Sequence, residues 1–565
     1  MVVKDYLNSA IAKVLGSYEA VPDDFVVELE IPNNPEHGDW STNAALKLAR
    51  YLRKAPREIA EEMVARLSDV FSPELITSAD VAGAGFINFR VANAYWWQLL
   101  GRILELESRY GRGSSGDGKK ALVEYVSANP TGPLTVGHGR NAVLGDTIAN
   151  VLDWSGYDVT REYYFNDAGR QMRVLGESVR SQYLSILNPS RETKTVEGGS
   201  GDVVVPEDFP EDGYLGEYII DIARSIASEH GDTKKAEDAE GFFKDAAEKV
   251  IFADIEATLG RIGIRQDEYF NERTLYDTGK IWNVVDGLRK EGLVYDSEGA
   301  VWFKTTEFGK EKDTVLVKSS GEPTYRLPDI AYHVDKVERS YDRIVDIFGA
   351  DHIATVPDVL KGVELLGYDV SGIDVVIYQF VTLVRSGKPV KMSTRKATYE
   401  TLDDLIDEVG ADVVRFFFLM RSANTHLEFD LDLAREASDK NPVFYLQYAH
   451  ARICSILRKA DEVGAGSTVA EPDLGQLVHA SEINLIKSLA QFPAVVEDAS
   501  SSLEPHRIAT YLRELAVAFT DFYGNCRIIG EEDGIASARL ALARAARIGL
   551  ANGLSVLGIS APDRM

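Results

Sequence analysis

The sequence predicts a multidomain α/β protein with a central parallel sheet, an N-terminal α/β domain and a C-terminal helix bundle. Residues 121–126 form an apolar, β-branched run, helical spacing begins at Gly139, and residues 157–165 form a second strand pattern. A strand, a helix and a strand in this order are typical of a right-handed crossover in a parallel sheet. From Asp412 onward the apolar spacing is helical, which predicts the bundle. A chain of 565 residues is long enough for several such domains.

Composition limits the class of protein. The chain carries 61 basic and 89 acidic residues, and this net charge of −28 is unfavourable for binding a nucleic acid. The charge is uneven, however, because residues 1–112 and 431–565 each carry only −4, whereas residues 191–256 carry −11. We expect the acidic stretch to face away from any polyanion and both ends to stay available for RNA. Two cysteines, no signal segment and no long apolar run predict a cytoplasmic protein that does not enter a membrane.

Residues 1–112 have the pattern of a small α/β domain. The segment 85–90 alternates like a strand with one wet face, which by itself makes Phe86 and Asn88 ordinary surface residues. Residues 111–118 are rich in glycine and serine. We therefore expect a flexible linker there and a domain boundary at residue 112.

The loop that follows the first strand of the central sheet is a candidate anion site. Residues 129–133 (Asn-Pro-Thr-Gly-Pro) interrupt regular structure before the next helix begins. The unpaired N–H groups at the start of that helix, together with its dipole, favour a phosphate. Gly137 lets a ligand approach the backbone, and His138 places a donor that can carry charge at the helix start. The alternative is an ordinary strand-to-helix turn with a histidine cap.

Two later segments carry candidate binding residues. Tyr325 and Asp329 are four residues apart and share one face of a predicted helix, where an aromatic plane beside a carboxylate can receive a guanidinium. A surface helix start explains the same pair equally well. The basic segment 391–396 lies between an expected strand at 375–384 and a helix at 401–409. That position suits a mobile phosphate clamp, although a charge run by itself is usually solvated surface.

Two of these segments resemble the signature motifs of class I aminoacyl-tRNA synthetases. Residues 135–138 (TVGH) resemble the HIGH motif, and their lead-in, residues 129–134 (NPTGPL), is similar to that of arginyl-tRNA synthetases. Residues 391–395 (KMSTR) resemble the KMSKS motif. Each motif departs from the family pattern once, with Thr135 in place of the first histidine and Thr394 in place of the second lysine. Each loop has therefore lost one cationic position.

The resemblance covers nearly the whole chain and implies a fold and an activity. It implies a tRNA D-loop-binding domain (1–112), a Rossmann-like catalytic domain (113–430) with an insertion at about 170–300, and a helical anticodon-binding domain (431–565). The implied reaction activates L-arginine with ATP to arginyl-adenylate and transfers it to the 3′ end of tRNA(Arg), with Mg²⁺ accompanying ATP. We expect a monomer.

The resemblance also implies roles for residues at matching positions. The residues implied in catalysis are His138, Lys391 and Arg395. Those implied in ATP binding are Thr135, Gly137, His138, Lys391, Met392 and Ser393. Those implied in arginine binding are Glu124, Asn129, Tyr325, Asp329, Asp351 and His352. Those implied in tRNA binding are Phe86, Asn88, Tyr445, Tyr448 and Arg452. No residue is assigned to a metal.

Two alternatives stay open at this point. One is another adenylyl-transferring enzyme with a similar histidine loop. The other, in view of the cations lost at Thr135 and Thr394, is a catalytically weakened paralogue that only binds tRNA. ATP–pyrophosphate exchange with arginine, measured with and without tRNA, distinguishes these readings.

The gap at Thr394 generates the first prediction. Lys391→Ala and Arg395→Ala should each slow adenylate formation by a factor on the order of hundreds, because one donor to developing phosphate charge contributes about 3–4 kcal/mol. Arginine binding should change little, since this loop contacts phosphates. Thr394→Lys should be neutral or mildly activating and should partly rescue Arg395→Ala. A normal exchange rate in Arg395→Ala would remove Arg395 from the site.

Overall fold

The computed structural model describes residues 3–565, apart from residues 19, 23, 33, 168, 198–201, 391–400, 467 and 470. The chain divides into two compact units. The first comprises Met1–Tyr110, Arg452–Gln491 and Leu515–Gly549, and the second comprises Gly111–Ala451, Phe492–Glu514 and Leu550–Met565. Across these described ranges, every helix is too short or too polar to cross a lipid bilayer.

The first unit contains an antiparallel sheet with strand order β1-β2-β4-β3. Its strands are β1 (Leu29–Glu30), β2 (Trp40–Thr42), β3 (Ile76–Ala82) and β4 (Phe86–Val91). The accompanying helices are α1 (Val3–Leu15), α2 (Ala44–Leu52), α3 (Pro56–Ser68) and α4 (Asn93–Leu106). Helix α17 (Ala480–Ala490) belongs to the same unit, where Tyr110 Oη donates to the carbonyl of Leu489 at 2.6 Å.

Long helices make up the C-terminal part of the chain, as the apolar spacing predicts. They are α16 (Pro442–Val463), α17, α18 (Phe492–Ser502), α19 (His506–Asn525) and α20 (Asp533–Val556). The expectation that everything after Asp412 is helical is wrong in one place. A short strand, β17 (Leu427–Asp430), pairs in parallel with β15 (Val381–Arg385).

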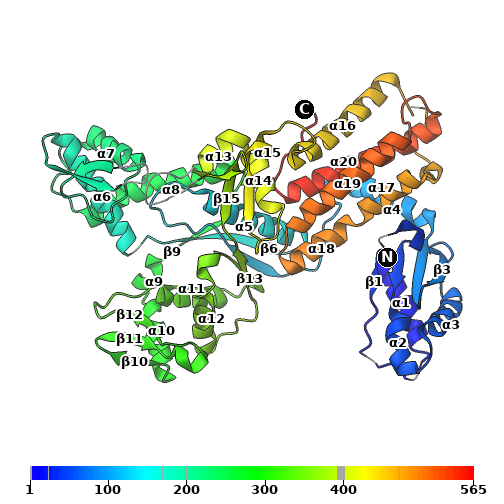
Figure 1. Cartoon of the computed structure of the whole chain (residues 1–565), viewed down its shortest axis with the longest axis horizontal. Coiled ribbons are helices and arrows are strands. Elements are labelled where there is room, and N and C mark those ends of the chain that lie inside the picture. Colours follow the sequence, from blue (N-terminus) through cyan, green and yellow to red (C-terminus); the bar gives the residue numbers. More distant parts are fainter. Residues whose placement is uncertain are drawn as a thin grey trace. The chain divides into compact units, whose positions relative to one another are not determined.

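The second unit is built on a five-stranded parallel sheet with strand order β14-β13-β5-β6-β9 (Figure 1). The strands are β5 (Lys120–Glu124), β6 (Asp158–Phe165), β9 (Glu268–Asn271), β13 (Arg343–Gly349) and β14 (Ile373–Tyr378), and α5 (Val136–Trp154) connects β5 to β6. The chain first adds strands on one side of β5 and later adds β13 and β14 on the other. Ligands of open parallel sheets bind where the strand order reverses in this way, outside the carboxyl ends of the strands.

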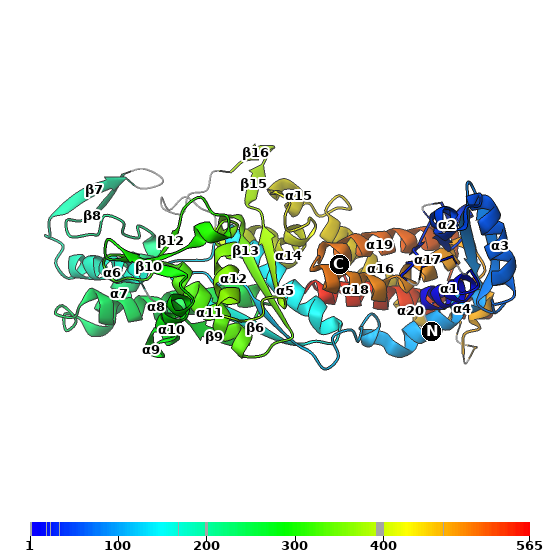
Figure 2. The same ribbon diagram turned by 90° about the horizontal axis from the view of Figure 1, so that it is seen from below.

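The remaining elements of the second unit surround this sheet. The segment between β6 and β9 contains α6 (Arg170–Leu187), α7 (Glu217–His230), α8 (Lys244–Arg261) and the hairpin β7 (Thr193–Glu197) and β8 (Asp202–Pro206), which Figure 2 shows. After β9 come α9 (Arg273–Asp277), α10 (Lys280–Lys290), β10 (Val294–Ser297), β11 (Ala300–Phe303), β12 (Thr314–Val317), α11 (Arg326–Glu338) and α12 (Val356–Leu365). Later elements are β16 (Lys388–Pro389), α13 (Leu402–Val409), α14 (Ala411–Leu419) and α15 (Leu431–Arg435). Figure 1 shows α11 and α12 side by side.

Two further expectations need correction. The single strand expected at 375–384 is two strands, β14 and β15, which belong to different sheets. The segment 111–118, expected to be a flexible linker, is bonded to the end of α5. The amide of Gly113 donates to the carbonyl of Trp154 at 2.8 Å, and the amide of Gly116 donates to that of Ser155 at 2.9 Å.

A row of four acidic residues crosses the parallel sheet in register. Asp346 on β13 pairs with Glu124 on β5, Glu124 with Glu162 on β6, and Glu162 with Glu268 on β9. We call these four residues the acidic row. Asp346, Glu124 and Glu162 are buried. Because like charges side by side on one face of a sheet destabilise it, this row requires cations on the same face.

Helix α11 supplies these cations. The Nζ of Lys336 donates to Glu124 at 2.5 Å and to Asp346 at 2.6 Å, and the Lys336 side chain is fully buried. The guanidinium of Arg339, the C-cap residue of this helix, donates twice to Glu162 at 2.5 and 2.8 Å. The face of α11 that packs on the sheet is therefore charged.

A second buried cation connects α5 to distant parts of the same unit. Arg415 on α14 donates from Nη2 to Asp146 on α5 at 2.6 Å, from Nε to the carbonyl of Leu557 at 2.8 Å, and from Nη1 to that of Ile262 at 2.9 Å. Both Arg415 and Asp146 are buried. One side chain thus holds α5 against the ends of α8 and α20.

This contact generates a stability prediction. Arg415→Met should lower the free energy of unfolding by about 3–5 kcal/mol, because it leaves the Asp146 carboxylate buried without its partner. Urea unfolding followed by circular dichroism measures the change. The matched control is Arg421→Met at an exposed position. Equal stabilities of the two variants would contradict the assigned role of Arg415.

Candidate active site

The turn after β5 is strained. Val126 and Ser127 have φ angles of 68° and 43°. These angles lie in the left-handed region of the backbone, which residues other than glycine rarely adopt. The amide of Val126 donates to Oδ1 of Asn141 on α5 at 2.6 Å, and Nδ2 of Asn141 donates to the carbonyl of Ile347 on β13 at 2.8 Å. Asn141 therefore fixes this turn against both the helix and the neighbouring strand.

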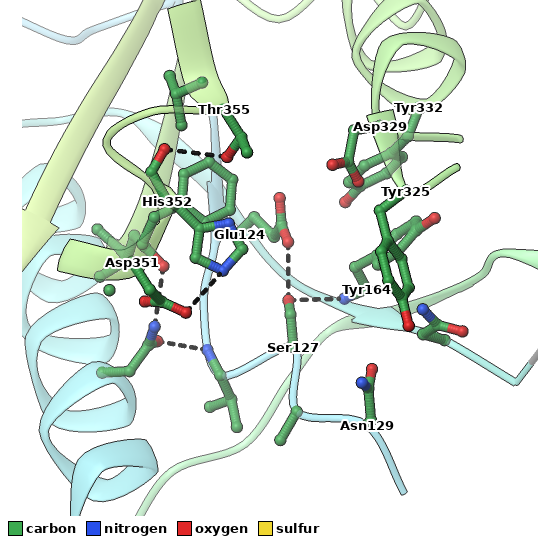
Figure 3. A pocket seen from close by; sticks show the side chains of 18 of the residues that line it. Glu124, Ser127, Asn129, Tyr164, Tyr325, Asp329, Tyr332, Asp351, His352 and Thr355 are labelled. Carbon is green, nitrogen blue, oxygen red and sulfur yellow. Dashed lines mark hydrogen bonds and ion pairs between the residues drawn. The ribbon is translucent and has the colours of Figure 1, made fainter. Parts of the chain in front are cut away.

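The strained turn also fixes Glu124, the last residue of β5. The Oγ of Ser127 donates to Oε1 of Glu124 at 2.8 Å and accepts from the amide of Tyr164 at 3.1 Å, as Figure 3 shows. The other carboxylate oxygen of Glu124 accepts from Lys336. Both oxygens are thus held in place at the point where the strand order reverses.

A cavity of about 520 Å³ opens at this edge of the sheet, within the usual range for small-molecule sites. His138 lines this cavity. So do all six residues that the family resemblance implies for arginine binding, which are Glu124, Asn129, Tyr325, Asp329, Asp351 and His352. Figure 3 shows Tyr325 and Asp329 on one side, Asp351 and His352 on the other, and Glu124 between them. Residues separated by more than 200 positions in the sequence therefore meet at one cavity.

The cavity is built for a cation. Burial, with a contribution from the Glu124 carboxylate, raises the pKa of Asp329 to about 6, although the nearby His333, His352 and Lys336 oppose the rise. A positive ligand would restore the charge of such a carboxyl group. A carboxyl group with a perturbed pKa in a cleft marks a candidate functional site.

Glu272 is a candidate functional residue that sequence reasoning missed. It follows β9 directly, it is buried, and one of its carboxylate oxygens accepts from Tyr164 Oη at 2.8 Å. Burial raises the pKa of Glu272 to about 7, and the charge of Asp329 adds to the rise. Glu272 lines an adjoining cavity of about 710 Å³ that shares Tyr325 with the first. An acidic residue after a strand was the available signal, but the sequence does not predict the four-residue β9.

The N-terminus of α5 has the histidine cap that was the alternative interpretation of this turn. The amide of His138 donates to Oγ1 of Thr135 at 3.4 Å, and the amide of Thr135 donates to Nδ1 of His138 at 3.2 Å. Burial lowers the pKa of His138 to about 4. Because Nδ1 accepts a hydrogen bond, the neutral ring carries its proton on Nε2. His138 can thus donate through Nε2, and its lowered pKa disfavours the charged form of the ring.

The second signature loop falls outside the described residues. This applies to Lys391, Met392, Ser393 and Arg395, which the sequence implies for catalysis and ATP binding. Gly137 lies in the first turn of α5, beside Thr135 and His138.

The two tRNA-binding candidates on β4 differ in exposure. Phe86 is 37% exposed, so its ring is available to a base. Asn88 is buried, and its Oδ1 accepts from Ser41 Oγ at 2.8 Å. Of the two, Phe86 therefore offers the accessible surface.

The three candidates on α16 differ in the same way. Tyr448 is 47% exposed and stacks on Phe444 with ring centroids 6.1 Å apart. Tyr445 is half-buried. Arg452 is exposed, and its guanidinium lies 4.7 Å from the ring centroid of Tyr523. Stacked aromatic rings and a guanidinium are groups on which bases can stack.

Comparison with known proteins first defines a class. Residues 100–417 match the family model of the class I tRNA synthetase (R) catalytic domain, which covers more than half of the chain. Residues 1–91 match the arginyl-tRNA synthetase N-terminal domain, and residues 446–565 match the DALR anticodon-binding domain. The parallel sheet, the capped helix of the HIGH-like motif and the cavity at the strand ends agree with this class.

Individual relatives narrow the class to a family. The chain is 58% identical over 563 residues to the arginine–tRNA ligase of Salinibacter ruber, with full coverage of both chains. It is 49% identical to that of Desulfotalea psychrophila over 95% of this chain and 94% of the relative. Its fold matches Thermus thermophilus arginyl-tRNA synthetase with a TM-score of 0.74 at 23% identity, covering 99% of this chain and 100% of that one. The chain therefore belongs to the arginyl-tRNA synthetase family.

This membership confirms the predicted fold class and the predicted activity as an ATP-dependent arginine–tRNA ligase. The same matches exclude the hypothesis that the chain is another adenylyl-transferring enzyme. The reading as a weakened, tRNA-binding paralogue finds no support among the relatives.

The cap of α5 generates a prediction on pH. Folding lowers the pKa of His138 from its ordinary value of 6.5 to about 4. Between these pH values the unfolded chain therefore binds a proton at His138 that the folded chain does not bind. Stability should therefore fall as the pH falls from about 6.5 to about 4. His138→Gln should lessen this fall without losing the cap, because a glutamine at this position can also accept from the amide of Thr135.

Urea unfolding at both pH values measures the effect. The matched control is His352→Gln, which changes an exposed histidine of the same cavity. If the free energies of the wild type and His138→Gln run parallel between these pH values, His138 is not a neutral, buried base.

Proposed function

We propose that the cavity at the carboxyl ends of β5 and β13 binds the arginine substrate. One observation carries the proposal: Asp329 and Glu124 line this cavity, Glu272 lines the adjoining cavity that shares Tyr325, and burial raises the pKa of both Asp329 and Glu272. A guanidinium is the complementary charge, and its planar donors suit carboxylates.

Within this cavity we assign contacts by chemistry. Asp329 and Glu272 accept hydrogen bonds from the guanidinium, and the exposed ring of Tyr325 stacks on its plane. Glu124 and Asn129 lie at the turn after β5 and are available for the α-ammonium group. Asp351 and His352 complete the opposite side of the cavity.

ATP is proposed to place its phosphates at the N-terminus of α5. Thr135, Gly137 and His138 offer backbone amides, a hydroxyl group and a neutral imidazole donor there. The arginine carboxylate oxygen forms a bond to the α-phosphorus of ATP, and the bond from that phosphorus to pyrophosphate breaks. A ribose hydroxyl of the tRNA 3′ adenosine then attacks the arginyl carbonyl and AMP leaves. The protein orients the reactants and stabilises phosphate charge, with Lys391, Met392, Ser393 and Arg395 assigned to the same phosphates.

Magnesium is proposed to enter with ATP. Mg²⁺ is held mostly by phosphates and water, with one or two carboxylates from the protein. Among the described residues that line the cavity, Asp351 offers an exposed carboxylate. The donor set therefore fits an ion that arrives on the nucleotide, which would neutralise phosphate charge when bound.

The proposal extends to the whole chain. The tRNA D-loop meets Phe86 and Asn88 in residues 1–112, and the anticodon region meets Tyr445, Tyr448 and Arg452 in residues 431–565, with the catalytic domain at 113–430. We further propose a monomer that acts in the cytoplasm.

The arginine assignment generates the next prediction. Asp329→Ala should weaken arginine recognition by about 2–4 kcal/mol, because a charge-assisted partner of the guanidinium is lost. The arginine KM in ATP–pyrophosphate exchange measures this. Glu338→Ala is the control, since Glu338 lies on the same helix but pairs with Lys280 away from the cavity. A wild-type arginine KM in Asp329→Ala would show that the pocket lies elsewhere.

Phe86 generates a prediction on tRNA. Phe86→Ala should weaken tRNA binding by about 1–3 kcal/mol if a base stacks on the ring. Filter binding measures the affinity, and thermal unfolding measures separately what the loss of this partly buried ring costs in stability. Trp282→Ala, at an exposed aromatic residue of α10, is the control and should bind tRNA normally. Unaltered affinity and charging in Phe86→Ala would make Phe86 an ordinary surface residue.

A further inference from the structure

The centre of the acidic row lies directly under the proposed arginine cavity. Glu124 is the member of the row that lines the cavity, and its neighbours on the adjacent strands are Asp346 and Glu162. Arg339 donates both of its short hydrogen bonds to Glu162. Lys336 is therefore the cation that faces Glu124, and it bridges this carboxylate to Asp346.

Lys336 is itself held from several sides. Its Nζ lies 4.2 Å from the ring centroid of Tyr332, and its two carboxylate partners keep the pKa of the ammonium raised although burial opposes this. Asp346 is fixed at its other oxygen by Nε2 of His333 at 3.0 Å, and Nδ1 of His333 lies 2.8 Å from the main-chain carbonyl of Asp329. Lys336 and His333 hold the pKa of Asp346 well below its usual range, against the effect of burial. The ammonium is thus charged and has one position available to it.

Stability alone does not explain this arrangement. Taking a lysine and two carboxylates out of water is costly, and well-packed apolar residues in place of buried ion pairs often leave a protein as stable or more stable. The contacts of Glu124 point to another role. Ser127 holds one carboxylate oxygen and Lys336 holds the other, so the remaining lone pairs of Glu124 have a fixed direction at the cavity.

We propose that Lys336 is a positioning residue for arginine binding, which acts by keeping the Glu124 carboxylate charged and fixed in direction. This inference rests on the proposed arginine cavity. Without Lys336, Glu124 would lie between two other acidic residues with no cation of its own. A buried carboxylate in that position takes up a proton or turns toward another donor, and in either state it no longer presents fixed acceptors to a substrate cation.

The test separates a positioning role from a merely structural one. Lys336→Met should raise the arginine KM in ATP–pyrophosphate exchange at least about tenfold, as expected for the loss of a charge-assisted contact, and should leave the ATP KM within about twofold. The defect should be smaller at pH 8.5 than at pH 6.5, because the unpaired carboxylate regains its charge as the pH rises. Lys361→Met is the control, since Lys361 is a partly exposed lysine of α12 that pairs with Glu364 and does not line the cavity.

A double-mutant cycle tests whether Lys336 acts through Glu124. Glu124→Gln should raise the arginine KM by itself, and Glu124→Gln with Lys336→Met should be no worse than Glu124→Gln alone, because the second change acts on a group already neutral. Independent, multiplicative effects would overturn the proposal. So would a Lys336→Met variant that unfolds at a lower temperature but keeps its arginine KM and its pH profile.

Folding and the status of the cavity are checked separately. If Lys336→Met does not fold, Lys336→Met with Asp346→Asn removes the cation together with one of its two carboxylates, and the same rise in arginine KM is expected. An unchanged arginine KM in both Glu124→Gln and Asp329→Ala would reject the cavity itself. A response in those two variants, with none in the lysine variants, would reject only the role of Lys336.

Discussion

The structure of the second unit depends on the compensation between the acidic row and helix α11. Four acidic residues in register would repel one another across the parallel sheet, and three of them are buried. Helix α11 packs on this face and brings Lys336 and Arg339 to the carboxylates, which offsets the repulsion. The same docking brings Tyr325 and Asp329, at the start of α11, to the carboxyl ends of the strands. The packing of one helix therefore both compensates the acidic row and places two residues of the cavity.

The parts of this architecture that could be predicted from the sequence are local. The strand, loop and capped helix at the HIGH-like motif, and the sharing of one helix face by Tyr325 and Asp329, follow from short-range spacing. The order of the domains followed from resemblance. The lowered pKa of His138 could not be predicted from the sequence. A histidine with the same neighbours in sequence can be exposed and cationic, and only the folded surroundings lower its pKa.

The rest depends on contacts between distant segments. Lys336 and Glu124 are 212 residues apart in the sequence, and the residue spacing in either segment does not predict their contact. Glu272 reaches the site because β9, a four-residue edge strand, ends there. Strand β17 was missed for a similar reason, since its four residues form a strand only by pairing with β15. Such short strands carry too few residues for a periodic pattern, so tertiary pairing decides their structure.

The strained turn at Val126 and Ser127 has a consequence for how this sequence can change. Each left-handed residue of this kind costs on the order of 1–3 kcal/mol, which the hydrogen bonds of Asn141 and Ser127 must offset. Glycine would adopt the same backbone without strain. A glycine in place of Ser127 would remove the hydroxyl that fixes Glu124. A change that relieves the strain at Ser127 would therefore also release the carboxylate at the cavity.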